Sequence, residues 1–138
     1  MPKSHSVLIT DDSLRTYFED VLGNTTEKAR VIGREEGGRA AGVAAVYSFE
    51  GRSCEAAWCG DKGWMTLGLL NLLHDYILNQ LGCARCTALI DASNETAIKQ
   101  AERVGFKREG CLREGAEDGD VYVYGMLKKD YRYGKERR

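Results

Sequence analysis

The segment Cys59–Thr66, with the sequence CGDKGWMT, combines residue types that could bind a phosphate group. It holds two glycines, one acid and one base, and it lies between a strand-like run and a strongly apolar, helix-like run. The first amides of a helix have no partner inside the helix and carry partial positive charge, and glycines let successive N–H groups converge on an anion. The segment therefore predicts either an anion-binding loop or a plain strand-to-helix turn, which also favours glycine. It is neither a Walker loop nor a G-x-G-x-x-G motif.

The cysteines and histidines do not form a convincing metal or redox site. The five cysteines are an odd number, and the CARC segment, Cys83–Cys86, has the spacing of a redox or zinc motif. Zinc would need two more good ligands, and two scattered histidines, His5 and His74, supply them poorly. We therefore expect no metal site, and small buried or half-buried thiols in a reducing compartment. His74 lies within an apolar helix pattern, which favours a structural role over that of a general base.

Length, composition and charge are those of an ordinary globular protein. The 138 residues suit one domain, 1–138, with 43% hydrophobic and 30% charged residues. A net charge of −1 gives no overall field for nucleic acid or an acidic membrane surface. The first residues lack a signal-peptide h-region, and no apolar run of about 18 residues occurs. We therefore expect a cytoplasmic protein with no nucleic-acid or membrane partner. The basic tail YRYGKERR is either a solvated end or a contact for an acidic partner.

Hydrophobic periodicity and turn residues predict an alternating series of strands and helices. The expected elements are, in order, a strand at 5–10, a helix at 11–23, strands at 29–35, 39–51 and 52–59, a helix at 64–81, a strand at 84–91, a helix at 93–104, and strands at 105–113 and 120–128. The apolar stripe of the long helix comprises Leu67, Leu70, Leu73, Ile77 and Leu81. Gly82 is expected to end this helix, and Ser93 to cap the next one.

The order of these elements predicts a mixed sheet. The strands at 29–35, 39–51 and 52–59 are joined by short turns, which indicates an antiparallel meander. A whole helix separates the strand at 52–59 from the strand at 84–91, and such a crossover implies parallel neighbours. Ligands of α/β sheets tend to bind at the carboxyl ends of parallel strands, where helix N-termini point. This places the loop Cys59–Thr66 where a phosphate-bearing ligand is expected.

The second half of the chain resembles the GNAT superfamily of acyl-CoA-dependent N-acyltransferases. One similarity is to the ribosomal-protein N-terminal acetyltransferase-like branch. In that branch an asparagine, a helix, a GF motif, an EG.LR motif and a D…YG.L motif follow one another, and this chain has ASNETAIKQAERVGFKREGCLR followed by DVYVYGML. GWMTLGLLNLLHDYILNQLGCARCTALIDASN is similar to small GNAT proteins encoded by bacteriophages and prophages. The resemblance spans essentially the whole chain. It implies an α/β (α+β), GNAT-like fold: a mixed central sheet of about six to seven strands, with one parallel β-α-β pair, a C-terminal hairpin and helices on both faces.

The resemblance also implies a binding mode for acetyl-CoA. The strand at 52–59 would diverge from the strand at 84–91 and open a cleft for the pantetheine arm, which would pair with the backbone there. The pyrophosphate would rest on the amides that follow, and the asparagine that opens the next helix would contact the pantetheine or the thioester. The residues expected to bind the cofactor are therefore Ala57, Trp58, Cys59, Gly60, Asp61, Lys62, Gly63, Trp64, Met65, Thr66 and Asn94.

The chain departs from the usual motif residues of the family at several positions. The family loop begins with glutamine or arginine and closes with glycine or alanine, whereas this chain has Gly60 and Met65 there. Ala101 stands where many members have a tyrosine acid, and Ala97 where the closer branch has a serine. The leaving thiol has a reference pKa of about 8.5 and departs without obligatory protonation, so the chemistry does not require this acid.

Two residues are the candidates for catalysis. Glu55 lies on the strand expected to line the cleft, where many family members place an acid, and it could take the proton of the amine. It could equally be an exposed strand carboxylate, or bind a cationic substrate. Tyr124 shares one face of the last strand with Tyr122, and it could reach the acceptor site or serve packing. Glu109 and Arg113 could shape the acceptor pocket or form an ordinary ion pair.

These features together favour an acetyl-CoA-dependent N-acetyltransferase that acts on a primary amine, in a small molecule or a protein, by direct attack in a ternary complex. The alternative is a GNAT-like module that has lost catalysis and binds a partner, such as an accessory or virion-associated phage protein. Either protein would work in the cytosol of a bacterium or a phage-infected host. A nucleotide- or metal-dependent enzyme on another α/β fold is less well supported. Strand edges near the C-terminus could also pair two copies in a homodimer.

Overall fold

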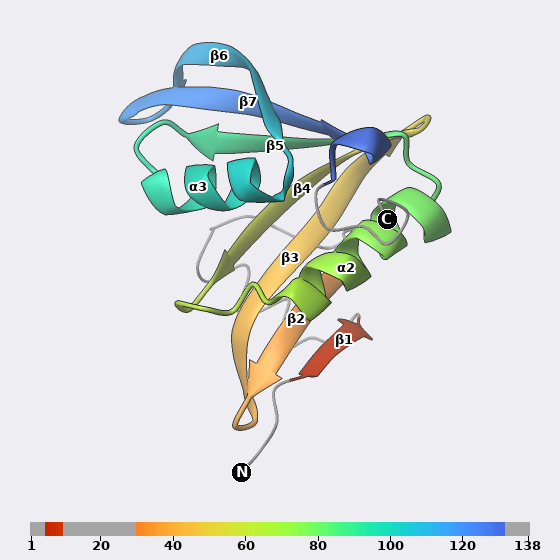
Figure 1. Ribbon diagram of the computed structural model, residues 1–138. Helices are drawn as coiled ribbons and strands as arrows, with labels where there is room; N and C mark the ends of the chain where they lie inside the picture. Colours follow the sequence, from red (N-terminus) through yellow and green to blue (C-terminus); the bar gives the residue numbers. More distant parts are fainter. Residues whose placement is uncertain (1–4, 10–29, 132–138) are drawn as a thin grey trace.

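A twisted sheet forms the centre of the structure, a computed structural model that describes residues 5–9 and 30–131 of the 138 (Figure 1). Its strands are β1 (His5–Ile9), β2 (Arg30–Glu36), β3 (Arg39–Glu50), β4 (Ser53–Gly60), β5 (Arg85–Asp91), β6 (Lys107–Ala116) and β7 (Gly119–Leu127). The seven described strands form one sheet in the order β1-β2-β3-β4-β5-β7-β6. The predicted mixed sheet of six to seven strands is thereby confirmed.

The first half of the sheet is the predicted antiparallel meander. β1 pairs with β2, β2 with β3, and β3 with β4, each in the antiparallel sense. Glycines with positive φ make the two tight turns, with Gly37 and Gly38 (φ 62° and 80°) between β2 and β3, and Gly51 (φ 60°) between β3 and β4. Glycine adopts this left-handed conformation without steric cost, so the sequences EGG and EGR fix where the strands reverse.

The parallel pair of strands at the centre separates after a short contact. β4 pairs with β5 only at Ser53↔Arg85, Cys54↔Cys86 and Glu55↔Thr87. Beyond this point β4 remains paired with β3 as far as Gly60, whereas β5 pairs with β7 along its whole length. The two strands therefore diverge towards their carboxyl ends, and a gap opens between them (Figure 1).

The long helix after β4 has two parts. The α-helix α2 (Leu67–His74) begins after Thr66, and a π-helical segment (Asp75–Gln80) continues it. The predicted range of 64–81 therefore starts about one turn too early. Leu67 was expected in the apolar stripe but is 54% exposed, because it lies in the first turn, at the edge of the sheet. Gly82, with a φ of 71°, ends the helical region as expected.

The second described helix, α3 (Glu95–Val104), follows β5. Its N-cap is Asn94, whose side-chain oxygen accepts a hydrogen bond from the amide of Ala97, so the prediction of Ser93 as the cap is wrong by one residue. A short 3₁₀ turn, Lys128–Asp130, follows β7. The helix predicted at 11–23 lies outside the described residues. No helix in the described ranges has the length and apolarity needed to cross a bilayer.

Both described helices pack on the same face of the sheet and enclose the main core. This core joins apolar side chains of β3, β4, β5 and β7 with those of α2 and α3. A smaller cluster, built around Val31, Val43 and Ala45, lies on the opposite face. Successive residues of β4 alternate between the two faces: Ala56 contributes to the helix-side core, and Ala57 packs against the smaller cluster.

Trp64 anchors the loop between β4 and α2 to the sheet. Its side chain is 1% exposed and lies directly over Gly42 of β3 and Gly60 of β4. A Cβ atom built on either glycine would overlap the indole ring. These two glycines therefore form a flat trough in the sheet, into which the indole fits.

We expect the Gly42→Ala substitution to destabilise the protein by about 1–3 kcal/mol, because the added methyl group must displace the indole from a well-packed core. Urea unfolding measures this change. The matched control is Gly110→Ala on β6, where a Cβ atom meets nothing within 4 Å. In a Trp64→Leu background the Gly42→Ala penalty should shrink. An equal penalty in both backgrounds would show that the indole does not set the requirement for glycine.

Candidate functional site

The loop after β4 turns sharply and then starts α2. The amide of Asp61 donates to the carbonyl oxygen of Ala41 at 2.7 Å, and the amide of Trp64 donates to the carbonyl oxygen of Asp61 at 3.1 Å. Gly63, with a φ of 79°, lies within this turn. Thr66 then caps the helix, because its hydroxyl oxygen accepts from the amide of Leu69 at 3.2 Å.

Several amides of this loop remain available to a ligand. Within the described part of the chain, the amides of Lys62, Gly63, Met65, Leu67 and Gly68 donate to no acceptor. The latter two belong to the first turn of α2, where the helix dipole adds partial positive charge. Lys62 is exposed beside them. This set of donors fits an anion. That the loop binds one stays a prediction.

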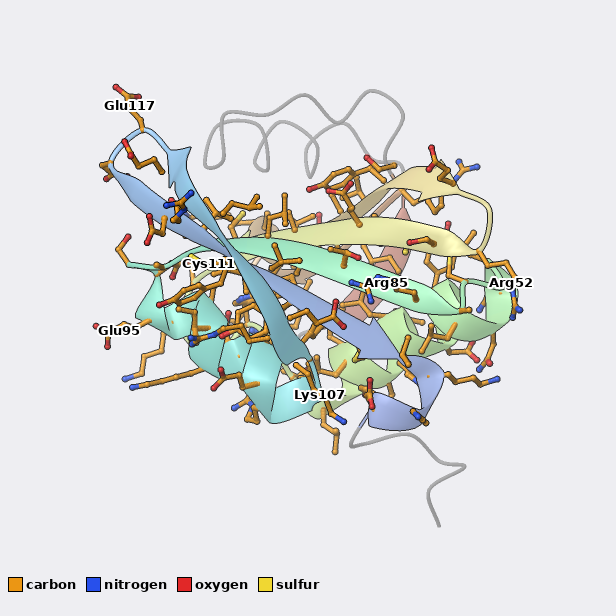
Figure 2. The ribbon with its side chains drawn as sticks, turned by 90° about the horizontal axis from the view of Figure 1, so that it is seen from above. Arg52, Arg85, Glu95, Lys107, Cys111 and Glu117 are labelled. Carbon is orange, nitrogen blue, oxygen red and sulfur yellow. The ribbon has the colours of Figure 1, made fainter. Side chains whose placement is uncertain are left out.

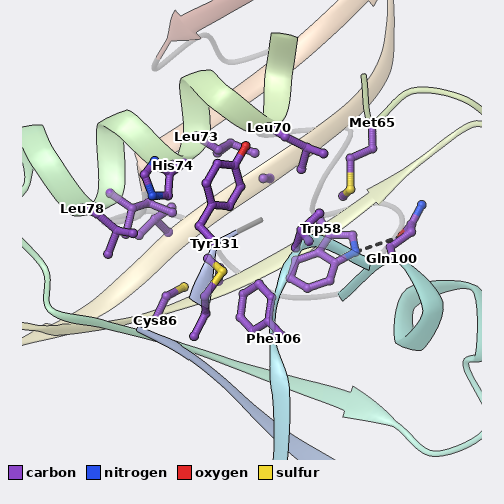
Figure 3. A pocket seen from close by; sticks show the side chains of 16 residues that line it. Trp58, Met65, Leu70, Leu73, His74, Leu78, Cys86, Gln100, Phe106 and Tyr131 are labelled. Atoms are coloured by element: carbon purple, nitrogen blue, oxygen red, sulfur yellow. Dashed lines mark hydrogen bonds between the residues drawn. The ribbon is translucent and has the colours of Figure 1, made fainter. Parts of the chain in front are cut away.

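An apolar pocket of about 50 Å³ lies where β4 and β5 diverge (Figure 3). α2 contributes Leu70, Leu73 and His74, the π-helical segment that continues it contributes Ile77 and Leu78, and Met65 lies at the loop end. The strands contribute Ala44, Val46, Ala56, Trp58, Cys86 and Met126, and the remaining wall consists of Gln100, Val104, Phe106 and Tyr131. The pocket thus reaches from the loop before α2 into the space between the two helices.

Trp58 spans one side of this pocket. Its Nε1 donates to Oε1 of Gln100 on α3 at 3.0 Å, and its ring lies 5.7 Å from that of Phe106 (Figure 3). Ala57 and Cys59, its neighbours on β4, turn their side chains to the other face of the sheet. Burial raises the pKa of the Cys59 thiol to about 11, so this thiol is neutral near pH 7. Among the described strands, the β4 backbone from Ala56 to Gly60 has a partner on its β3 side only, which leaves its other edge open.

Glu55 lies at the last paired position before β4 and β5 separate. It pairs with Thr87 of β5 on one side and with Tyr47 of β3 on the other. The alternation along β4 puts its side chain on the face opposite the helices. Burial raises the pKa of the Tyr47 phenol, and the charge of Glu55 raises it further. The carboxylate is only half-buried, so a ligand can approach it from this face.

Tyr124 lies on the helix side of the sheet. Its side chain is fully buried, and its hydroxyl donates to Oε2 of Glu102 on α3 at 2.8 Å. The hydroxyl oxygen of Tyr124 in turn accepts from Nε of Arg108 at 3.3 Å, and burial raises the pKa of the phenol. The guanidinium of Arg108 stacks over Tyr122 with 3.8 Å between its Cζ atom and the ring centroid. The structure therefore places Tyr124 away from Glu55, across the sheet, and a catalytic role for it at the acceptor site stays a prediction.

Asn94 has a structural partner in addition to its predicted role. It follows β5, and its Oδ1 accepts from the amide of Ala97 at 3.1 Å. The residue is exposed, and its side-chain NH₂ group donates to no acceptor among the described residues. Its contact with the pantetheine or the thioester stays a prediction.

Most of the cysteines are buried or half-buried, and His74 packs against an aromatic ring. Cys54, Cys83 and Cys86 are buried and Cys59 is half-buried, as predicted, whereas Cys111 is exposed on β6 (Figure 2). His74 stacks on Tyr131, with 3.9 Å between ring centroids, which supports the predicted structural role. Within residues 5–9 and 30–131, no group of three or more histidine, cysteine or acidic side chains could hold a metal ion.

Sequence reasoning missed two arginines. Arg34 of β2 binds the loop before α2 from below, and only its place next to Gly42 in the sheet brings it there. Arg85 of β5 forms a 2.6 Å ion pair with Glu109, which lowers the pKa of the glutamate (Figure 2 shows Arg85). The suggested pairing of Glu109 with Arg113 is therefore wrong. Glu109 can reach Arg85 across β7 because Gly125, which lies between them, has no side chain to block the ion pair.

Comparisons with known proteins identify the fold. No protein-family model matches the chain, and no curated protein matches its sequence. Among solved structures, a mutant of the spermidine N-acetyltransferase SpeG from Vibrio cholerae matches with a TM-score of 0.74 and 16% identity, over 98% of this chain and 98% of that one. An N-acetyltransferase from Staphylococcus aureus matches with a TM-score of 0.73 and 22% identity, over 92% and 99% of the two chains.

A third structure extends this agreement. An acetyltransferase of the GNAT family from Streptococcus pneumoniae matches with a TM-score of 0.74 and 14% identity, over 91% of this chain and 99% of that one. At such identities the likeness concerns the fold: this chain has the fold of the GNAT acetyltransferases. Its similarity to the ribosomal-protein N-terminal acetyltransferase-like branch and to the phage-encoded proteins stays a prediction.

We expect Asn94→Ala to lower the free energy of unfolding by about 1 kcal/mol, because the amide of Ala97 loses its capping oxygen. Asn94→Ser is the matched control, since serine caps equally well but lacks the side-chain NH₂ group. Chemical denaturation compares the two variants. If Asn94→Ser is as destabilised as Asn94→Ala, the side chain stabilises the protein by another route than capping.

Proposed function

We propose that this protein is an acetyl-CoA-dependent N-acetyltransferase that moves an acetyl group to a primary amine. One observation carries the proposal: β4 leaves β5 directly after Glu55, and the gap leads from this carboxylate to the free amides at the start of α2. The free amides lie at the start of α2, the apolar pocket lies on the helix side of the gap, and Glu55 lies at the point where the two strands part. This arrangement suits a long thioester cofactor with a pyrophosphate at one end and the reactive group at the other.

The residues present fit the pyrophosphate, the pantetheine arm and the thioester end of acetyl-CoA. The amides of Met65, Leu67 and Gly68, with Lys62 nearby, would bind the pyrophosphate. The open edge of β4 at 57–59 would pair with the amides of the pantetheine arm, and the apolar pocket would take its thioester end. When bound, acetyl-CoA supplies the activated acetyl group. Trp58 and Gln100 line this passage and would orient the arm between β4 and α3.

Glu55 would prepare the amine for attack. An alkylamine has a pKa of about 10 and must lose a proton before it can attack a thioester. The carboxylate of Glu55 could receive this proton directly or through a water molecule. An amide of β4 near Trp58 would donate to the oxyanion of the tetrahedral intermediate. Holding both reactants at the strand gap contributes most, up to ~7–11 kcal/mol of the barrier in favourable cases.

No dedicated acid is needed in this proposal. Ala101, in the place of the usual tyrosine, is fully buried, and the hydroxyl of Tyr124 is bound to Glu102. The leaving thiolate is stable enough to depart on its own, because the reference pKa of a thiol is only about 8.5. Tyr124 would then serve to hold α3 against β7.

The acceptor is proposed to be a primary amine that approaches from the face opposite the helices. Glu55 lies on that face and would attract a cationic amine before it takes the proton. One of the structural neighbours acts on spermidine, and a polyamine is therefore a reasonable first compound to try. A peptide N-terminus presents the same chemical group, and the cytosol supplies both kinds of acceptor.

A second candidate function follows from the same observations. Because Tyr124 is engaged and Ala101 replaces the usual acid, the cleft could bind a partner or CoA without turnover. A GNAT-like binding module of this kind, such as a phage accessory protein, would show no acetyl transfer with any amine.

We expect CoA and acetyl-CoA to bind in a calorimetric titration, and acetylated amine to form with a panel that includes spermidine and short peptides. The product should be detected by mass spectrometry. A thiol reagent that measures released CoA would also react with the exposed Cys111 of the protein and give a false signal. Glu55→Gln should lower kcat/KM by about 10²–10⁴-fold, the range for a lost general base, and leave CoA affinity unchanged. Glu50→Gln, an exposed glutamate of β3, is the matched control.

Three outcomes are informative. No binding of CoA or acetyl-CoA at millimolar concentration would refute the proposal. Binding without any acetyl transfer would favour the second candidate, the binding module. Turnover that survives Glu55→Gln would retain the enzyme but remove Glu55 as its base.

A further inference from the structure

Arg34 is a buried cation beneath the loop that precedes α2. Its residue is 6% exposed, in a core that is otherwise mostly apolar. Its Nε donates to the carbonyl oxygen of Trp64 at 2.8 Å, and its Nη2 donates to the carbonyl oxygen of Gly63 at 3.2 Å. Its Nη1 forms an ion pair with Oε2 of the largely exposed Glu36 at 3.0 Å. A buried guanidinium needs such partners, so these bonds fix its position and that of the two carbonyl groups.

The two carbonyl bonds determine which way the neighbouring amides point. In a trans peptide the N–H group lies on the side opposite the preceding C=O group. Arg34 holds the carbonyl of Trp64, so the amide of Met65 must point away from Arg34. The same reasoning applies to the carbonyl of Gly63 and the amide of Trp64, which donates to Asp61. The carbonyl of Trp64 also accepts from the amide of Thr66 at 3.0 Å. The amide of Met65, which directly precedes the first turn of α2, is thereby held in a direction away from Arg34.

The guanidinium also strengthens the Met65 donor electrostatically. A carbonyl that accepts a charged hydrogen bond is more polarised, and its peptide N–H becomes a better donor. The positive charge lies directly behind the loop, and only Glu36, which is mostly in solvent, is paired with it among the described residues. Arg34 thus adds positive potential to the loop without touching the ligand.

We propose that Arg34 is a positioning residue for anion binding: it fixes and polarises the loop amides that receive the pyrophosphate of the cofactor. This inference rests on the proposed function and deepens it, because it assigns the affinity for the pyrophosphate to a residue of β2 outside the loop. Arg34 has no contact with the reacting atoms, so it affects cofactor binding and leaves the transfer step unchanged.

The test compares two ligands that differ in the pyrophosphate. CoA carries it, whereas S-acetylpantetheine keeps the same pantetheine arm, with an acetylated thiol, and lacks the nucleotide and its phosphates. Arg34→Met removes all of the hydrogen bonds, and Arg34→Lys keeps the charge but cannot hold both carbonyl groups in the same way. Arg30→Met, at an exposed arginine of the same strand, is the matched control. Thermal unfolding and the near-UV circular dichroism of Trp64 establish that each variant is folded.

We expect Arg34→Met to weaken CoA binding by about 10-fold or more, because it removes charge-assisted bonds that organise the donors. The affinity for S-acetylpantetheine and the value of kcat at saturating acetyl-CoA should stay within about twofold of the unchanged protein. The CoA affinity of Arg34→Lys should fall between those of Arg34→Met and the unchanged protein. Arg30→Met should bind CoA like the unchanged protein. If Arg34→Met does not fold, Arg34→Lys decides, by the same ratio of the two ligand affinities.

Two results would overturn the inference, and they differ from failure of the proposed function. An equal loss for both ligands would show that Arg34 only supports the fold, and no loss for CoA would show that the loop does not depend on it. In either case the unchanged protein still binds CoA, and the proposed function stands. If the unchanged protein binds neither ligand, the proposed function fails and the inference on Arg34 falls with it.

Discussion

The contact of Trp64 with Gly42 and Gly60 is the interaction on which the rest of the site depends. Two glycines on neighbouring strands leave a flat area in the sheet, and the buried indole covers it. The loop after β4 must therefore fold back over β3 before α2 can begin, and this path leaves its amides free at the helix start. A segment that is polar and glycine-rich in sequence is thus fixed from the core side. The core residue Trp64 thus holds in place the loop that is proposed to bind the anion.

The separation of β4 from β5 turns this anchored loop into one end of a site. Each strand keeps a full antiparallel partner, β3 for β4 and β7 for β5, so they can part without leaving either one unsupported. Trp58 and Phe106 pack against each other in the widened space, and both line the apolar pocket. An open strand edge, the pocket and the half-buried Glu55 all follow from this one divergence. The acetyltransferase proposal uses each of them.

Local sequence signals predicted most of the fold, and long-range contacts account for what they missed. Alternating and helical patterns predicted the described strands and helices, because each element buries only one face. The crossover between β4 and β5 predicted their parallel contact and the place of the loop. Adjacent residues such as Ser93 and Asn94 are both good caps, so sequence alone could not choose between them. Arg34 lies on β2, about thirty residues before its carbonyl partners, and only the sheet register brings them together.

The central claim is that the amides between β4 and α2 receive the pyrophosphate of CoA, and amide chemical shifts measure this directly. In a ¹H–¹⁵N NMR titration with CoA, the account predicts large shifts for the amides of Met65, Leu67 and Gly68. Amides on β6, such as that of Cys111, should stay in place. Shifts that are confined to another part of the chain, or signals at the start of α2 that do not move at saturating CoA, would contradict the account.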